Sequence, residues 1–218
     1  MRSQIKWLIP VALTCLSIGS NIQKAAANTI FPFNTVYETE LTITPIPNTD
    51  VVRASVTGTN SNAPYGLTNL ISENYSRIDI ETGIGTFSAN PEDLGLDPAV
   101  FPFLEEEYFG SGDDKLFGFS QITAQFDFQN ETVSGIGTVN ITGGAGRFTG
   151  ATGTLDFEEN GDFDPNATGP ILGEAIINGS FQVPHQIPEP SDTIGLAFGV
   201  VGSGLFLRRK KSKTTLKR

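Results

Sequence analysis

Short runs of alternating apolar and polar residues fill the middle of this chain, and this pattern is typical of β-strands. Ala124, Phe126 and Phe128 share one face of such a run, and polar residues occupy the positions between them. The runs are rich in Val, Ile, Thr, Phe and Tyr, with Gly and Pro between them, and none of helical length has an apolar period of about 3.6 residues. The pattern therefore predicts an all-β domain.

We expect eight short strands with one apolar face each, and a closed sheet leaves no exposed edge. The fold expected is a single antiparallel β-barrel of about eight strands, or a sandwich. Residues 88–114 contain three prolines and read as a long loop, whose Phe101, Phe103 and Phe109 we expect to plug one mouth of the barrel. The predicted strands are 36–44, 51–57, 75–82, 115–120, 122–129, 132–142, 149–158 and 173–183.

The first 27 residues have the pattern of a cleavable secretion signal. Basic residues precede an apolar run over 7–18, and the small residues Ala25 and Ala27 then provide a site for signal peptidase. The alternative is a retained anchor, for which this apolar run is short. We predict an N-terminal signal helix that is absent from the mature protein.

The C-terminal end has three parts in a fixed order. Pro188, Glu189 and Pro190 are followed by an apolar run over 194–207, and then by a basic cluster. The cluster consists of Arg208, Arg209, Lys210 and Lys211. We expect a short transmembrane helix with its basic end in the cytoplasm. A permanent tail anchor is the alternative, but a run this short favours transient membrane insertion.

This order of parts resembles the PEP-CTERM sorting signal of Gram-negative bacteria. The resemblance covers 188–211, with a basic tail over 212–218. It implies recognition by an exosortase, cleavage near Pro188–Pro190, and delivery to the outer surface or extracellular matrix. Residues 63–68 and 109–118 also look like stretches of cyanobacterial PEP-CTERM proteins of unassigned role.

Between the two signals, residues 28–187 form the predicted domain, and it is strongly acidic. It holds 22 Asp and Glu against four Lys and Arg, a formal charge of −18. Such a charge repels nucleic acid and anionic membrane surfaces and attracts cations, and it also keeps an extracellular protein soluble. We therefore expect no nucleic-acid partner.

Residues 143–155 join two predicted strands through a glycine-rich turn, GGAGRFTGATGTL. No helix follows to hold a phosphate, so the segment predicts a bulged hairpin that turns Phe148 inward. It resembles the hairpin of the dirigent and allene oxide cyclase-like β-barrel group, whose fold is an eight-stranded antiparallel barrel. That likeness covers about 15 residues and concerns the fold more than any activity.

Few residues are available for catalysis. The single histidine, His185, lies in a predicted linker, and the single cysteine, Cys15, lies in the leader. The predicted domain therefore has no catalytic triad that uses His or Cys, and no zinc site. No two carboxylates have a spacing that marks them as the catalytic pair of a glycosidase. We expect no enzyme and assign no catalytic residue.

Calcium is the one cofactor with a traceable set of ligands. Asp156, Glu158, Asn160, Asp162 and Asp164 fall near the oxygen-ligand positions of a calcium loop. Ala167 stands where such a loop needs its bidentate Glu, and the flanks read as strands. A solvated acidic turn is the alternative.

These patterns lead to an exported, surface-delivered β-domain with a non-enzymatic binding or structural role, whose ligand is extracellular polysaccharide or a small apolar molecule. One alternative is a barrel enzyme of cyclase or isomerase type, which needs a deep apolar cavity. Another is an ice-binding or calcium-dependent adhesion protein.

Overall fold

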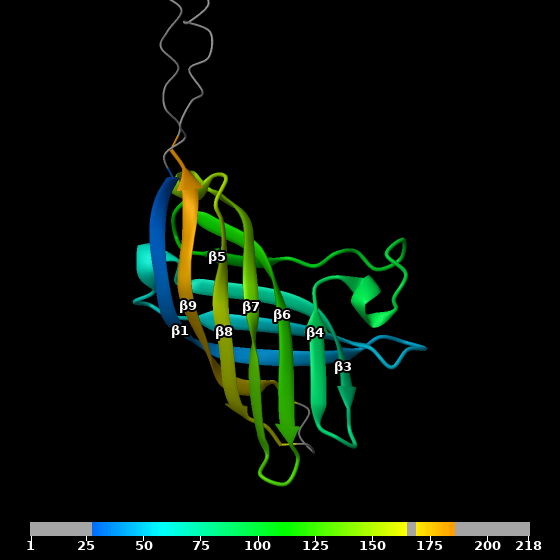
Figure 1. Cartoon of the computed structure of the whole chain (residues 1–218). Helices are drawn as coiled ribbons and strands as arrows, with labels where there is room; N and C mark the ends of the chain where they lie inside the picture. Colours follow the sequence, from blue (N-terminus) through cyan, green and yellow to red (C-terminus); the bar gives the residue numbers. More distant parts are fainter. Residues whose placement is uncertain (1–27, 165–168, 186–218) are drawn as a thin grey trace, which may run out of the picture. The chain divides into compact units, whose positions relative to one another are not determined.

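The computed structural model describes residues 28–164 and 169–185, whose strands form one antiparallel sheet (Figure 1). The strands are β1 (Asn28–Pro45), β2 (Val52–Thr59), β3 (Asn69–Asp79), β4 (Ile84–Ser88), β5 (Glu106–Phe109), β6 (Lys115–Asp127), β7 (Thr132–Ala145), β8 (Thr152–Asp162) and β9 (Ile171–Pro184). The short 3-10 helices are η1 (Pro64–Gly66), η2 (Pro91–Leu94) and η3 (Gly146–Phe148). Within the described ranges there is no α-helix, and no helix is long and apolar enough to cross a membrane.

The sheet closes on itself because β2 pairs with β1 on one side and with β3 on the other. Around the ring the order is β2-β1-β9-β8-β7-β6-β4-β3. The short strand β5 shares the position of β4, since both pair with β3 and β6. Nine strands therefore fill eight positions, and the predicted all-β antiparallel fold is confirmed in its closed, barrel-like form.

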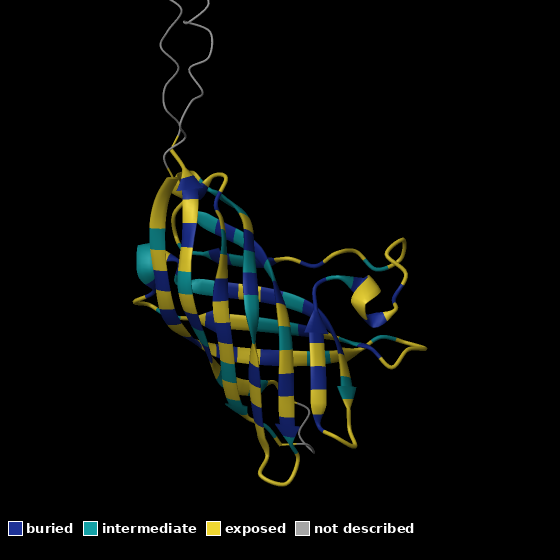
Figure 2. Ribbon diagram, in the orientation of Figure 1, coloured by how far each residue is buried: buried dark blue, intermediate teal, exposed yellow. Residues whose placement is uncertain are grey.

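Alternation along each strand separates the interior of the barrel from its outer face (Figure 2). In β1, Phe33, Tyr37 and Leu41 are buried, and each neighbouring position faces solvent or is only half-buried. The buried side chains gather in two apolar clusters. The first includes Phe33, Leu70, Leu116, Phe148, Ile177 and Phe181, and the second includes Leu41, Ala54, Phe87, Phe126 and Val133.

Several predicted strand boundaries are wrong, and the largest difference is in β1, which begins at Asn28 rather than at residue 36. The runs 115–120 and 122–129 belong to one strand, β6, with a register shift between Phe117 and Gly118. Strand β3 begins at Asn69 rather than at residue 75, because its inward face carries polar residues that hide the apolar alternation. Strands β4 and β5 were not predicted, and β5 forms inside the segment that we expected to be a loop.

The connection between β4 and β5, residues 89–105, packs against the outside of the ring. There it completes a third apolar cluster with Val51 and Tyr75. Phe101 lies edge-on to Tyr75, with ring centroids 6.1 Å apart, and Phe103 lies edge-on to Phe119 at 5.3 Å. The expectation that Phe101 and Phe103 plug a barrel mouth is wrong. Tyr75 and Phe119 face outward, and the two phenylalanines cover the apolar surface of these rings on the outside of the barrel.

The glycine-rich segment connects β7 to β8 through η3. Gly146 has φ of 61°, a left-handed conformation that favours glycine, and the next turn buries Phe148 completely. The main-chain N–H and the Nε of Arg147 donate to Asp114, each at 2.7 Å, and Nη2 donates to the Tyr65 carbonyl at 3.1 Å. The prediction that Phe148 turns inward is confirmed.

Candidate functional site

The predicted processing residues lie outside the described residues and stay predictions. They are the signal cleavage residues Ala25 and Ala27, the sorting residues Pro188, Glu189 and Pro190, and the basic residues Arg208, Arg209, Lys210 and Lys211.

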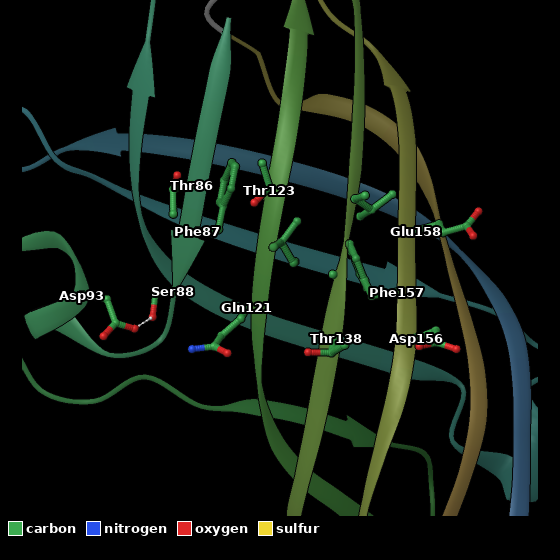
Figure 3. Close-up of a pocket in the computed structure, with 13 residues that line it drawn as sticks. Thr86, Phe87, Ser88, Asp93, Gln121, Thr123, Thr138, Asp156, Phe157 and Glu158 are labelled. Atoms are coloured by element: carbon green, nitrogen blue, oxygen red, sulfur yellow. Dashed lines mark hydrogen bonds between the residues drawn. The ribbon is translucent and has the colours of Figure 1, made fainter.

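A hollow of about 710 Å³ lies on the outer face of the barrel, across β4, β6, β7 and β8 (Figure 3). Its volume is within the range of roughly 300–1,000 Å³ typical of small-molecule sites. Phe87 and Phe157, which belong to the interior core, lie among its lining residues. The others are Thr86, Ser88, Asp93, Gln121, Ile122, Thr123, Ile136, Gly137, Thr138, Asp156 and Glu158.

The strand register arranges these side chains in two rows across the strands. Gln121, Thr138 and Asp156 are successive partners on β6, β7 and β8, and form a polar row. The second row contains an exposed apolar residue, because Ile136 pairs with Thr123 on one side and with Glu158 on the other. The side chain of Ile136 is 68% exposed, so the hollow offers an aliphatic surface beside amide, hydroxyl and carboxylate groups.

A second hollow of about 640 Å³ lies over β7, β8, β9 and β1, where its lining begins two residues further along β7 and β8 than that of the first. Its lining is also dominated by short polar and acidic side chains, among them Ser134, Asn160, Asp162, Glu174 and Glu38. We call the two hollows together the outer-face groove. Along β7 its lining runs from Thr132 to Thr138, and this extent suits a ligand longer than a single small molecule.

The outer-face groove carries negative charge without a basic residue in its lining. In the described part of the chain, each Lys and Arg forms an ion pair away from the groove. These pairs are Arg53–Glu73, Arg77–Asp50 at 2.8 Å, Lys115–Glu107 at 2.6 Å and Arg147–Asp114 at 2.7 Å.

The predicted calcium ligands lie along a strand rather than around a loop. Asp156 and Glu158 line the first hollow, Asn160 and Asp162 line the second, and Asp164 follows the end of β8. Residues two apart on a strand lie about 7 Å from one another. No group of three or more Asp, Glu, His or Cys side chains in the described residues is placed to hold one metal ion. Calcium binding by this set stays a prediction.

The sequence did not indicate a second site, a layer of polar side chains inside the barrel between the two apolar clusters. Glu106 on β5 is fully enclosed and accepts hydrogen bonds from the Tyr108 hydroxyl and from Ser72 Oγ, the latter at 3.2 Å. Asn74 Nδ2 donates to Ser72 Oγ at 3.2 Å and to Ser120 Oγ at 3.0 Å. On the opposite wall, Glu159 of β8 accepts from Thr39 at 3.4 Å.

Burial changes the acidity of both interior carboxyl groups. Desolvation raises the pKa of Glu106, although hydrogen bonds from Tyr108, Ser120 and Ser72 oppose the shift. Desolvation also raises the pKa of Glu159 to about 7, against the hydrogen bond from Thr39, and the charge of Glu106 adds to the rise. Glu159 therefore exchanges its proton near neutral pH, and burial disfavours the ionised form of Glu106.

The free space inside this layer is small. Leu41, Phe87, Phe126, Asn74 and Glu159 are among the residues around a space of about 20 Å³. That volume fits one water-sized particle and is far below the roughly 300 Å³ of a small ligand pocket. The described interior is thus a packed core with a polar centre, and a substrate could enter it only after the core opens.

The described residues therefore form two candidate sites. One is the open polar groove on the outer face, and the other is the closed acidic layer inside the barrel. Comparisons of this chain with protein-family models, with curated proteins and with solved structures found no match.

Proposed function

We propose that this chain is an exported bacterial surface protein that binds extracellular polysaccharide through the outer-face groove, without catalysing a reaction. The observation that carries the binding proposal is the lining of the groove, where exposed Ile136 lies between a hydroxyl and a carboxylate side chain and beside a row of amide, hydroxyl and carboxylate side chains. Sugar rings have apolar C–H faces and hydroxyl edges, and this lining offers a complementary surface for both.

The dimensions of the groove favour a polymer over a small apolar ligand. Along β7 the linings of the two hollows follow one another from Thr132 to Thr138, which at about 3.4 Å per residue is roughly 20 Å. The interior, in contrast, leaves about 20 Å³ for a guest. The cyclase or isomerase alternative needs an interior cavity, so it stays an alternative without a substrate space in the described structure.

The negative charge of the groove limits which polysaccharides can bind there. Asp156, Glu158 and Glu174 line it, and no basic residue does. Polymers rich in uronate or sulfate groups would be repelled, whereas a neutral chain would not. The proposed ligand is therefore a polysaccharide without acidic groups, and a neutral glucan represents this class in the test.

Export and sorting rest on the two terminal signals. A signal peptidase site at Ala25–Ala27, and an exosortase-type signal from Pro188 to Lys211, would release residues 28–187 outside the cell. Transient insertion of the C-terminal apolar run would precede cleavage.

The binding proposal is tested with two matched arginine variants. Ile136→Arg places a long charged side chain in the groove, and Ile71→Arg places one on the outer face of β3, where residue 71 lines neither hollow. Both isoleucines are exposed, so both variants should fold. We expect neutral glucans to retard the wild type and Ile71→Arg in affinity electrophoresis, and to retard Ile136→Arg at least about tenfold less, which is 1.4 kcal/mol. Equal retardation of the two variants would reject the groove.

The sorting proposal is tested in a bacterial host that carries an exosortase. The wild type should appear outside the cell with both ends shortened, as measured by intact mass. A variant with Pro188→Ala, Glu189→Ala and Pro190→Ala should remain in the membrane fraction. A full-length C-terminus on the wild type would show a permanent anchor instead.

A further inference from the structure

We propose that the polysaccharide site continues beyond the outer-face groove, over β9 and β1, into a third hollow, so that one bound chain contacts two aliphatic positions, Ile136 and Val36. This inference rests on the proposed function and extends it from a local contact to a site for several sugar units of one chain. Its consequence is an affinity that increases with the length of the ligand.

The first observation is that the third hollow adjoins the groove. It has a volume of about 620 Å³ and lies beside β1, β2 and the connection from β2 to β3. Glu38 of β1 and Glu174 of β9 line both this hollow and the second hollow of the groove. The two glutamates are cross-strand partners, so one pair of side chains borders both hollows. A chain that leaves the second hollow over this pair therefore enters the third.

The second observation is a row of side chains that connects the first hollow with the third. Strand register places Ile136, Glu158, Ile176 and Val36 in one line across β7, β8, β9 and β1. Ile136 is 68% exposed in the first hollow, Val36 is 43% exposed in the third, and Ile176 is half-buried between them. Three strand spacings of about 4.8 Å separate Ile136 from Val36, which is roughly 14 Å along the barrel wall. The row therefore offers apolar surface to more than one sugar ring.

The polar lining of the third hollow matches the chemistry of the groove. Besides Val36 and the two glutamates, the described lining consists of amide and hydroxyl side chains, which can bind sugar hydroxyl groups. Asn60 ties the connection between β2 and β3 to β1, because its Nδ2 donates to Thr35 Oγ1 at 3.0 Å and to the Val36 carbonyl at 2.8 Å. The hollow is therefore held in shape before a ligand arrives, which lowers the entropic cost of binding. The amide and hydroxyl residues are Thr59, Asn60, Ser61, Asn62, Thr68 and Asn69.

The charge of this face favours a sugar chain over a second copy of the protein as its occupant. Residues 28–187 carry a formal charge of −18, and the described linings of the three hollows contain carboxylates and no Lys or Arg. Two copies that met through this face would bring like charges together, which is unfavourable. A neutral glycan adds no charge to the face.

The experiment combines arginine variants with ligands of two lengths. Val36→Arg blocks the third hollow, and Ile136→Arg blocks the first. Ile30→Arg is the matched control, because Ile30 is 67% exposed on the same strand as Val36 and lines none of the three hollows. Calorimetric titration of the full-length chain measures dissociation constants for a linear glucose disaccharide and octasaccharide, prepared from the glucan that retards the wild type. Urea midpoints check that the variants are folded.

We expect the wild type and Ile30→Arg to bind the octasaccharide at least about tenfold more tightly than the disaccharide. Val36→Arg should lose this gain and bind the disaccharide as the wild type does. If Val36→Arg and Ile30→Arg bind the octasaccharide equally well while Ile136→Arg binds it weakly, the extension is overturned and the groove stands. An equal loss of both ligands by a folded Val36→Arg would also overturn it. A wild type that binds neither the polymer nor an oligosaccharide would reject the proposed function, and the extension with it.

Discussion

Glu158 and Glu159 are neighbours in sequence, but β8 sends them to opposite sides of the barrel wall. Glu158 is exposed among the groove residues, and Glu159 borders the interior space beside Asn74. The carboxyl group of Glu158 is therefore in water, and that of Glu159 is in the desolvated core. Substitutions at the two positions remove the same group and so separate the effect of burial from the effect of charge.

We predict that stability falls as the pH rises through the range in which Glu159 ionises. Its pKa is about 7 in the folded protein against 4.5 ordinarily, so the native state holds a proton that the unfolded state has released. The free energy of unfolding should therefore decrease from pH 4.5 to about 7, by at most about 3 kcal/mol. Burial raises the pKa of Glu106 as well, which adds a slope of the same sign.

Urea titrations across this range, with choline as the salt cation, measure the slope. Glu159→Gln should flatten the decrease, because glutamine carries no charge at any pH, and Glu158→Gln should keep it. A Glu159→Gln variant with the slope of the wild type would show that Glu159 does not titrate in this range.

The buried carboxyl group of Glu106 also leads to a prediction for Tyr108. This residue is fully buried and donates its hydroxyl to Glu106. Tyr108→Phe should destabilise the protein by about 1–3 kcal/mol, with the larger loss in mildly alkaline buffer, because a carboxylate needs its donors more than a protonated acid does. The free energy of unfolding is measured in acid and in mildly alkaline buffer.

Tyr37 provides the control for this comparison, because its hydroxyl donates to the neutral carbonyl of Leu67 at 2.6 Å. Tyr37→Phe should cost about 1 kcal/mol in both buffers. Parallel pH dependence in the two variants would contradict the assigned role of Glu106.

Two side chains of β3, Arg77 and Tyr75, donate hydrogen bonds to the segment between β4 and β5, and the bond from Tyr75 leads to a prediction. The Tyr75 hydroxyl donates to the carbonyl of Pro102 at 2.8 Å and ties residues 89–105 to the outside of β3. Tyr75→Phe should cost about 1 kcal/mol and speed amide hydrogen exchange within 89–105. Tyr65→Phe removes a comparable bond, to the Pro32 carbonyl at 2.7 Å, and should leave exchange in 89–105 unchanged.

The all-β antiparallel fold was predictable because most strands alternate apolar and polar residues, and β1, β7 and β9 follow that rule. Strand β3 was misplaced for a physical reason. Its inward residues Ser72, Asn74 and Ser76 are polar, so the apolar alternation stops where the interior becomes polar. The polar site that escaped prediction and the misplaced start of β3 therefore have the same cause.

One interior residue did leave a signal in the sequence. Leu155 and Phe157 alternate as core positions of β8, and the next position in that alternation is Glu159. Glu106 left none, because it stands in a run of three glutamates inside an expected loop, and its pairing with Ser72 of β3 and Gly118 of β6 places it in the sheet. Its burial depends on contacts between distant strands, which a local pattern does not encode.

Phe148, in the glycine-rich connection between β7 and β8, is a position where truncation of the side chain should greatly lower the stability of the protein. Phe148 is 0% exposed and lies edge-on to Phe31 and Phe181, with ring centroids 5.3 and 5.1 Å away. Phe148→Ala should therefore cost about 3–5 kcal/mol, because a buried ring leaves a cavity. Phe128→Ala removes a ring that is 39% exposed, and should cost less than about 2 kcal/mol. Urea unfolding of both variants measures the difference, and equal losses would mean that Phe148 does not pack in the folded barrel.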